Sequence, residues 1–233
     1  MPRIITKTTN IMVEEVLGRL SQQYGPFSWK PRLEPVAELV TTILSQNTSD
    51  TNAARAFQGL IDRFGSLVEV TSARTEDIEL SIKVGGLASQ KAVYIKGALD
   101  RIIQYQGNLS LDFLRDFSLE EAKSWLTSIP GVGKKTAAVT LCFAFGMPAM
   151  AVDTHVYRVT KRLGVIKEKT TIDRAHDLLE QMVSPEKIYS LHVCLITHGR
   201  QTCKALRPLC SSCTLADICP IGKTQNIKSH TET

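Results

Sequence analysis

Apolar residues recur along most of the chain at the three- and four-residue spacing of one helix face. In the clearest case they follow Pro35, a residue type favoured in the first turn of a helix: Val36, Leu39, Val40, Ile43 and Leu44. The same spacing predicts helices over residues 11–20, 50–64, 89–105, 118–127, 134–144, 154–163, 172–182 and 185–197. Because no alternating strand pattern of any length occurs, the sequence predicts an all-α fold.

Polar residues and glycines are expected to set the ends of these helices. Asn10 and Asp50 each precede an apolar run and are predicted as N-caps, since a short polar side chain accepts hydrogen bonds from first-turn N–H groups. Ser118 and Glu121 have the spacing of a capping box, and Gly65 is expected to end the helix that begins at Asp50.

The helical pattern is interrupted between residues 146 and 153 by an apolar stretch that contains Gly146 and Pro148. We expect a hinge there, with a central helical bundle over residues 28–148 and a second helical lobe made of residues 1–27 and 149–222. The polar, unpatterned residues 223–233 are predicted to form a flexible tail.

With 233 residues, 43% of them hydrophobic and 22% charged, the chain has the composition of a globular protein and not of a collagen-like or disordered one. Its 28 basic residues outnumber its 23 acidic ones. The excess is local: six basic residues accompany two acidic ones over residues 131–168, and five accompany two over residues 199–233. Such clustering favours contact with a polyanion such as DNA.

No segment of the sequence has the pattern of a membrane anchor or a secretory signal. The longest uncharged apolar segment, residues 136–152, has 17 residues and is interrupted by Gly146 and Pro148. A membrane-spanning helix needs about 20 apolar residues. The expected location is therefore the cytoplasm, and a monomer with no membrane partner is the simplest expectation.

Four of the six cysteines fall close together in the pattern Cys203-x6-Cys210-x2-Cys213-x5-Cys219. In a reducing compartment such a cluster indicates a metal site before disulfides. Four thiolates suit a tetrahedral zinc ion or a [4Fe–4S] cluster, and the single Cys-x2-Cys pair leaves both open. An electron-transfer protein would also use such a set of cysteines.

A Gly-Val-Gly turn, Gly131 to Gly133, joins the helices predicted over residues 118–127 and 134–144. Two glycines permit a tight turn without Cβ atoms, so the turn would present backbone N–H groups beside the positive end of a helix dipole and the cation Lys134. This arrangement suits a phosphate oxygen and predicts a DNA grip that is independent of base sequence. A plain helical hairpin without a ligand is the alternative.

Lys135 and Asp153 are the residues whose types suit chemistry on a nucleotide. At the second position of a helix, Lys135 feels the positive dipole end and the charge of Lys134, which both favour a free amine. A free amine can attack the anomeric carbon of a nucleotide and form a Schiff base, whereas a phosphate-binding cation is the alternative role. Asp153 is predicted to cap the helix that begins at Thr154, and its carboxylate can also stabilise a cationic sugar.

Three motifs resemble those of the endonuclease III family of DNA glycosylases, in the helix–hairpin–helix superfamily. They are the run from Ile129 through Lys135-Thr-Ala, the string Ala-Val-Asp153-Thr-His, and the cysteine loop with its 6-2-5 spacing. The resemblance covers residues 10–222 and implies a two-lobed fold, in which the bundle bears the hairpin and the second lobe bears a [4Fe–4S] cluster on the four cysteines. It also implies that Lys135 is the nucleophile and that Asp153 assists departure of the base.

The implied function is a bifunctional DNA glycosylase and abasic-site (AP) lyase of base-excision repair, acting on DNA of the nucleoid. Such an enzyme removes damaged, oxidised pyrimidines from duplex DNA and cleaves the abasic strand by β-elimination. A thymine or uracil mismatch glycosylase and a non-catalytic DNA-binding module are the alternatives. The relative that removes adenine has a serine at the lysine position and a glutamate three residues before the Leu44 equivalent, so Lys135 and Thr41 argue against it.

A base inside a duplex must be extruded before its anomeric carbon can be attacked. The resemblance makes Leu87 the wedge that enters DNA, and Gln46 and Asn47 the residues that fill the space of the flipped base. Here the chain departs from the family pattern Leu-Ser-Ala-Gln-Ala-Thr-Asp, since Asn47 takes the glutamine position and Gln46 replaces a small residue. The full set expected to contact DNA is Gly131, Val132, Gly133, Lys134, Thr136, Gln46, Asn47 and Leu87.

Overall fold

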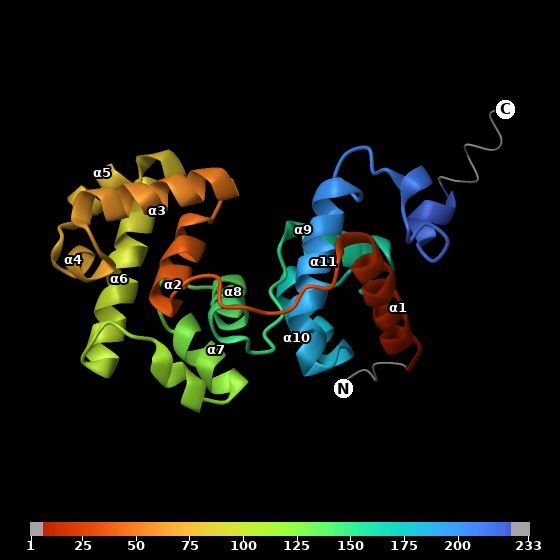
Figure 1. The fold of residues 1–233 in the computed structure, drawn as a ribbon, viewed down its shortest axis with the longest axis horizontal. Helices are drawn as coiled ribbons and strands as arrows, with labels where there is room; N and C mark the ends of the chain where they lie inside the picture. Colours follow the sequence, from red (N-terminus) through yellow and green to blue (C-terminus); the bar gives the residue numbers. More distant parts are fainter. Residues whose placement is uncertain (1–6, 225–233) are drawn as a thin grey trace. The chain divides into compact units, whose positions relative to one another are not determined.

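The computed structural model describes residues 7–224 as helices joined by short connections (Figure 1). This part of the chain contains no β-strand, which confirms the predicted all-α fold. The α-helices are α1 (Lys7–Tyr24), α2 (Pro35–Leu44), α3 (Asp50–Phe64), α4 (Leu67–Ser72), α5 (Thr75–Ser81), α6 (Ala88–Gln106), α7 (Leu119–Thr127), α8 (Lys134–Phe145), α9 (Thr154–Arg162), α10 (Ile172–Met182) and α11 (Ile188–Gln201). The short 3-10 helices are η1 (Lys83–Gly85), η2 (Asp112–Asp116), η3 (Pro185–Lys187) and η4 (Cys210–Ser212).

Residues 30–147 form one compact unit, which contains α2 to α8. In this unit α2 packs against α3, α6 and α8, and its apolar face is fully buried: Leu39, Val40, Ile43 and Leu44. α7 packs against α8, and the Gly-Val-Gly turn connects them. The turn, the segment after α2 and the segment before α6 are therefore supported by one aliphatic core.

Residues 7–29 and 148–224 form the other compact unit. α11 packs against α1 and α9, and α1 also packs against α10. These helices bury an aliphatic core that includes Leu20, Val156 and Leu195. The unit carries Asp153 directly before α9 and the cysteine loop after α11.

Two predicted N-caps are wrong. α1 begins at Lys7, so Asn10 lies inside the helix. α3 is capped by Ser49, whose hydroxyl accepts a hydrogen bond from the N–H of Asn52 at 3.2 Å, and Asp50 is the first helical residue. In the second case a polar residue of the same class, one position earlier, takes the cap.

Two short helices, α4 and α5, are missing from the prediction, because segments of six and seven residues show too little periodicity. A capping pattern marks the first of them, since the Ser66 hydroxyl accepts a hydrogen bond from the N–H of Glu69 at 3.3 Å. The helix predicted over residues 185–197 is the turn η3 followed by α11, which continues to Gln201. The capping box of Ser118 and Glu121 is confirmed.

Within residues 7–224, no helix is both long enough and apolar enough to cross a membrane. Of the predicted tail, residues 225–233 lie outside the described residues. Residues 223 and 224 belong to a helical turn, in which the Lys223 N–H donates to the Cys219 carbonyl at 3.0 Å. These two residues are therefore part of the fold.

Candidate functional site

The Gly-Val-Gly turn presents the start of α8 as an open helix end. Gly131 adopts a φ of 84°, and the N–H of the buried Val132 donates to the Ile129 carbonyl at 3.0 Å, which closes the turn. Gly133 is the N-cap and has no side chain to accept hydrogen bonds from the first N–H groups of α8. A helix start left open in this way attracts an anion, because its N–H groups and its dipole both favour negative charge.

The two glycines of the turn serve different purposes. A Cβ on Gly131 would lie 2.2, 2.4 and 2.5 Å from three atoms of the Tyr94 ring on α6, so close packing requires a glycine there. A Cβ on Gly133 would meet no atom within 4 Å, and the φ of −87° suits any residue. Gly131 is therefore needed for the fold, whereas Gly133 leaves open surface beside α8.

We expect Gly131→Ala to lower the free energy of unfolding by about 2–4 kcal/mol, the combined cost of a positive φ and of overpacking. Gly133→Ala should lower it by no more than about 1 kcal/mol, since alanine is a weaker N-cap than glycine, yet weaken binding to undamaged duplex DNA, because the methyl group would stand where the predicted phosphate approaches. Denaturant unfolding and fluorescence-anisotropy titration measure the two effects. Equal losses of stability in both variants would contradict this division of roles.

Three polar residues form the first turn of α8. Lys134 and Lys135 are exposed at its first and second positions, whereas Thr136 is only 4% exposed. The Lys135 amine is thus presented to solvent beside the open helix start, at the helical position that the sequence predicts. The Thr136 hydroxyl faces the protein, so contact of this residue with DNA would involve its backbone.

Gln46 and Asn47 take different positions after α2. The Gln46 Nε2 donates to the Gly131 carbonyl at 2.9 Å and to the Thr136 Oγ1 at 3.3 Å, so this side chain braces the turn. Asn47 is exposed and adopts a left-handed φ of 53°. Of the two, Asn47 is the side chain that is open to a partner, and it occupies the glutamine position of the family pattern.

An open groove of about 480 Å³ lies beside the turn. Its lining comes from residues 127–133, from Gln46, and from Gln90 and Tyr94 of α6, whose side chains are hydrogen-bonded to each other at 2.9 Å. Leu87, at the start of the same helix, is 54% exposed and has a left-handed φ of 49°. Of the three residues expected to enter DNA, Asn47 and Leu87 are therefore exposed on tight turns of this unit, whereas the Gln46 amide is bound to the Gly-Val-Gly turn.

In the other unit, Asp153 is the N-cap of α9, as predicted. Its Oδ1 accepts a hydrogen bond from the N–H of Val156 at 2.7 Å, and the side chain is partly buried. The positive end of the α9 dipole stabilises the carboxylate anion at this position. The cap therefore holds a negative charge in a defined place.

Three side chains hold the backbone that leads to Asp153. The Met150 N–H donates to Glu180 at 2.8 Å, and the Nδ1 of His176 lies 2.7 Å from the Met150 carbonyl. The Nδ1 of His192 lies 2.9 Å from the next carbonyl in the chain, that of residue 151. Side chains of α10 and α11 thus hold the segment before Asp153 in place. The spacing of these side chains in the sequence gives no indication of this role.

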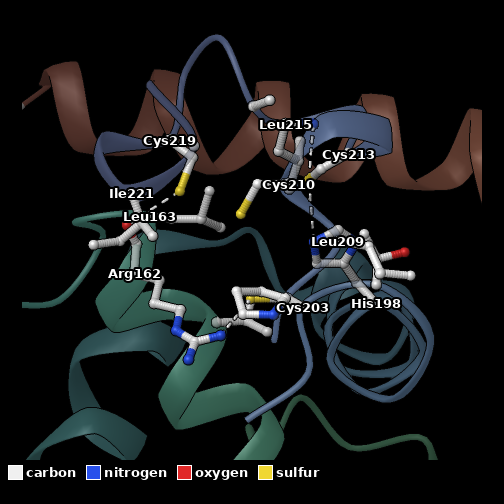
Figure 2. A pocket seen from close by; sticks show the side chains of 15 residues that line it. Arg162, Leu163, His198, Cys203, Leu209, Cys210, Cys213, Leu215, Cys219 and Ile221 are labelled. Atoms are coloured by element: carbon white, nitrogen blue, oxygen red, sulfur yellow. Dashed lines mark hydrogen bonds between the residues drawn. The ribbon is translucent and has the colours of Figure 1, made fainter. Parts of the chain in front are cut away.

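The four cysteines line one pocket after α11, and Figure 2 shows their sulfur atoms around the same space. None of the four forms a disulfide bond. Three nitrogen atoms approach the sulfurs: Arg162 lies 3.4 Å from Cys203 Sγ, the Leu215 N–H 3.4 Å from Cys213 Sγ, and His198 Nε2 3.7 Å from Cys213 Sγ. Burial lowers the pKa of His198 to about 4, so its ring is neutral at neutral pH.

The chemistry of this pocket fits a metal–sulfur centre. Burial raises the pKa of Cys210 and of Cys213, and the neighbouring cysteines raise both further. Four thiolates in one pocket therefore need a compensating positive charge, which a metal centre supplies, and the nearby nitrogen donors suit metal-bound thiolates. Among residues 7–224, no three His, Cys, Asp or Glu side chains are already arranged around one point for a single metal ion.

Two arginines that add to the local positive charge hold the cysteine loop in place. Arg158 donates from Nε to the Cys203 carbonyl at 3.0 Å. Arg162 donates to the carbonyls of Lys204 and Ala205 at 2.7 and 2.9 Å. From the sequence, Arg158 and Arg162 can be recognised only as two basic residues. Their contacts with the cysteine loop cannot be predicted, because the fold brings these carbonyls to them.

Residues 40–185 match the family model described as HhH-GPD superfamily base excision DNA repair protein. The chain belongs to this family. It is 36% identical over 190 residues to the endonuclease III of Sulfolobus acidocaldarius, a match that covers 78% of this chain and 80% of that protein. It is 37% identical over 175 residues to an inferred DNA glycosylase of Arabidopsis thaliana, where the match covers 75% of this chain and 57% of the plant protein.

The fold of this HhH-GPD protein also matches a solved structure of endonuclease III in a trapped covalent intermediate with DNA. The TM-score is 0.79 at 27% identity, and the match covers 95% of this chain and 99% of the solved one. The resemblance to the endonuclease III family is thereby confirmed. The HhH-GPD protein is a DNA glycosylase of base-excision repair with AP lyase activity.

Proposed function

We propose that the HhH-GPD protein removes oxidised pyrimidines from duplex DNA and cleaves the abasic strand through a Schiff base on Lys135. The observation that carries the proposal is the exposed Lys135 amine at the second position of α8, beside an open helix start that suits a phosphate. The endonuclease III structure with the same fold is a covalent intermediate with DNA, as an enzyme with a nucleophilic residue would form.

The proposed reaction begins with attack of the Lys135 amine on the damaged nucleotide. The Lys135 Nζ bonds to the anomeric carbon of the damaged nucleotide, and the bond from that carbon to the base breaks. The base leaves with the electron pair of that bond and takes up a proton. The nitrogen lone pair then forms the C1′=N double bond as the C1′–O4′ bond breaks, O4′ takes up a proton released by the amine, and the opened sugar is held as a Schiff base. Loss of a proton from C2′ then expels the 3′ phosphate, and water releases the lysine.

Asp153 supplies negative charge in this scheme. As the base leaves, the sugar gains oxocarbenium character, and a preorganised carboxylate stabilises that charge. The cap hydrogen bond holds one carboxylate oxygen, and Glu180 and His176 hold the preceding backbone. The anion is therefore in place before a substrate binds, and no reorganisation is needed as the charge develops.

The hairpin and two exposed turns provide the DNA grip. The open start of α8 and Lys134 bind the phosphate backbone, which requires no particular base sequence. Leu87 enters the base stack as a wedge, and Asn47 fills the space of the extruded base. Gln46 acts indirectly, because its amide nitrogen is bound to the turn.

The cofactor in this proposal is a [4Fe–4S] cluster that stabilises the C-terminal loop, with four ligands: Cys203, Cys210, Cys213 and Cys219. A loop this short has no core of its own, and the bound cluster would hold Lys204 and Arg207 where they can meet DNA phosphates. The purified protein should be brown and contain about four iron atoms per chain. A colourless protein with zinc in place of iron would contradict the assignment.

A panel of lesion duplexes tests the proposed substrate class. We expect faster base release from duplexes with thymine glycol than from duplexes with T·G or U·G mismatches. In this proposal the protein acts as a monomer on DNA of the cytoplasmic nucleoid. Single-turnover rates for the three duplexes provide the comparison. A preference for mismatches would make the protein a mismatch glycosylase, and binding without base release would make it a DNA-binding module.

A further inference from the structure

Lys91 on α6 is a lysine with only 1% of its surface exposed. Its Nζ donates to the carbonyls of Leu44 and Gly85, each at 2.7 Å, and burial lowers the pKa of the amine. Moving a lysine head group out of water is costly, whereas methionine would fill a similar space at lower cost. The specific contribution of the lysine is therefore its pair of hydrogen bonds.

Both acceptors stand directly before an exposed turn. Leu44 is the last residue of α2, and Asn47 lies on the turn that follows. Gly85 is the last residue of η1, and Leu87 lies two residues later. Asn47 and Leu87 have φ values of 53° and 49°. Asparagine tolerates this left-handed conformation, whereas a leucine is strained in it, so the turn that carries Leu87 in particular needs support from outside.

We propose that Lys91 is a positioning residue that ties these two turns together, so that Leu87 and Asn47 enter the duplex as one rigid pair during base extrusion. The inference rests on the proposed DNA contacts of Leu87 and Asn47. Because one amine is bound to both carbonyls, a shift of either turn breaks a buried hydrogen bond. The wedge and the gap-filling residue thus keep a fixed separation before they meet DNA.

Lys91→Met keeps the length of the side chain and removes both hydrogen bonds. We expect single-turnover base release from a lesion duplex to fall about 10- to 100-fold, as when groups that position a substrate are misplaced by about 1 Å. Borohydride trapping on a single-stranded abasic oligonucleotide should stay at the wild-type level, because that substrate needs no extrusion from a duplex. A residue that only stabilises the core would affect both substrates equally.

Lys96→Met is the matched control. Lys96 lies on the same helix and also donates to a backbone carbonyl, that of Thr71 at the end of α4, which is remote in the chain from both turns. Its replacement should leave base release from the duplex and trapping on the single strand at wild-type levels. A loss in Lys96→Met as large as that in Lys91→Met would overturn the proposal.

A double-mutant cycle with Leu87→Ala tests the link itself. If Lys91 acts through the wedge Leu87, Lys91→Met should lower the single-turnover rate of base release much less in a protein that already carries Leu87→Ala than in the wild type. Strictly additive losses would overturn the proposal. If Lys91→Met does not fold, Lys91→Arg enters the same cycle, because its larger planar head group keeps the charge but holds its donors in a rigid fork, unlike the single Nζ that lies between the two carbonyls.

The wild-type protein separates this inference from the proposed function. A wild type that releases no base and forms no trapped complex on abasic DNA contradicts the proposed function. A wild type that does both, together with a Lys91→Met variant of unchanged activity on the duplex, contradicts the role of Lys91 alone.

Discussion

Lys135→Ala should abolish borohydride trapping on abasic duplex DNA and lower strand cleavage at abasic sites by about 10⁴-fold or more, as expected when a catalytic nucleophile is removed. The alanine side chain has no amine that could form a Schiff base. The fold should persist, since Lys135 is exposed and alanine is a strong helix former. Gel analysis of trapped complexes measures the loss, and thermal unfolding verifies the fold.

Lys134→Ala is the matched control, one position earlier on α8. Because Lys134 is proposed to bind phosphate, its loss should weaken binding to DNA. The slope of log K against log [salt] should also fall by the amount expected for about one phosphate contact. Trapping should return at saturating protein, since the nucleophile is intact. Trapping that persists in Lys135→Ala and vanishes in Lys134→Ala would place the nucleophile at residue 134.

Asp153→Asn should lower the single-turnover rate of base release by about 10²- to 10³-fold, the range for removal of one preorganised electrostatic group. Asparagine caps a helix about as well as aspartate, so the Val156 N–H keeps its acceptor and thermal stability should change little. Parallel measurement of the rate and of thermal unfolding separates lost charge from lost structure.

Thr171→Ala is the control for Asp153→Asn, because it removes a helix cap without removing a negative charge. The Thr171 hydroxyl caps α10 and accepts a hydrogen bond from the Arg174 N–H at 3.2 Å. Its removal should lower the free energy of unfolding by about 1 kcal/mol and leave base release intact. If Asp153→Asn also changes only stability, Asp153 serves as a cap and has no part in base departure.

Most helices of this chain could be predicted because each buries an apolar face of helical period. The helix over residues 172–182 agrees at both ends, where a periodic stretch meets a strong cap. α4 and α5 are too short for periodicity to identify them. The cap predicted at Asp50 failed because Ser49, a polar residue one position earlier, takes that position. The cap predicted at Asn10 failed because α1 already includes that residue.

Motifs in the sequence identify the candidate reactive residues but not the residues that hold them. Lys135, Asp153 and the cysteines stand in short strings of defined spacing. Gln46, in contrast, binds atoms that lie 85 and 90 residues away, and Lys91 binds one that lies 47 residues away. Such contacts exist only after tertiary packing, and a single sequence has no periodicity that reports them.

The central claim is that the Lys135 amine forms the covalent bond to DNA, and peptide mass spectrometry tests it most directly. The wild-type protein is reduced with borohydride on an abasic duplex, digested with a protease that does not cleave at lysine, and fragmented to separate residues 134 and 135. We predict the reduced sugar adduct on Lys135. An adduct on Lys134, or on any other amine of the chain, would contradict the account.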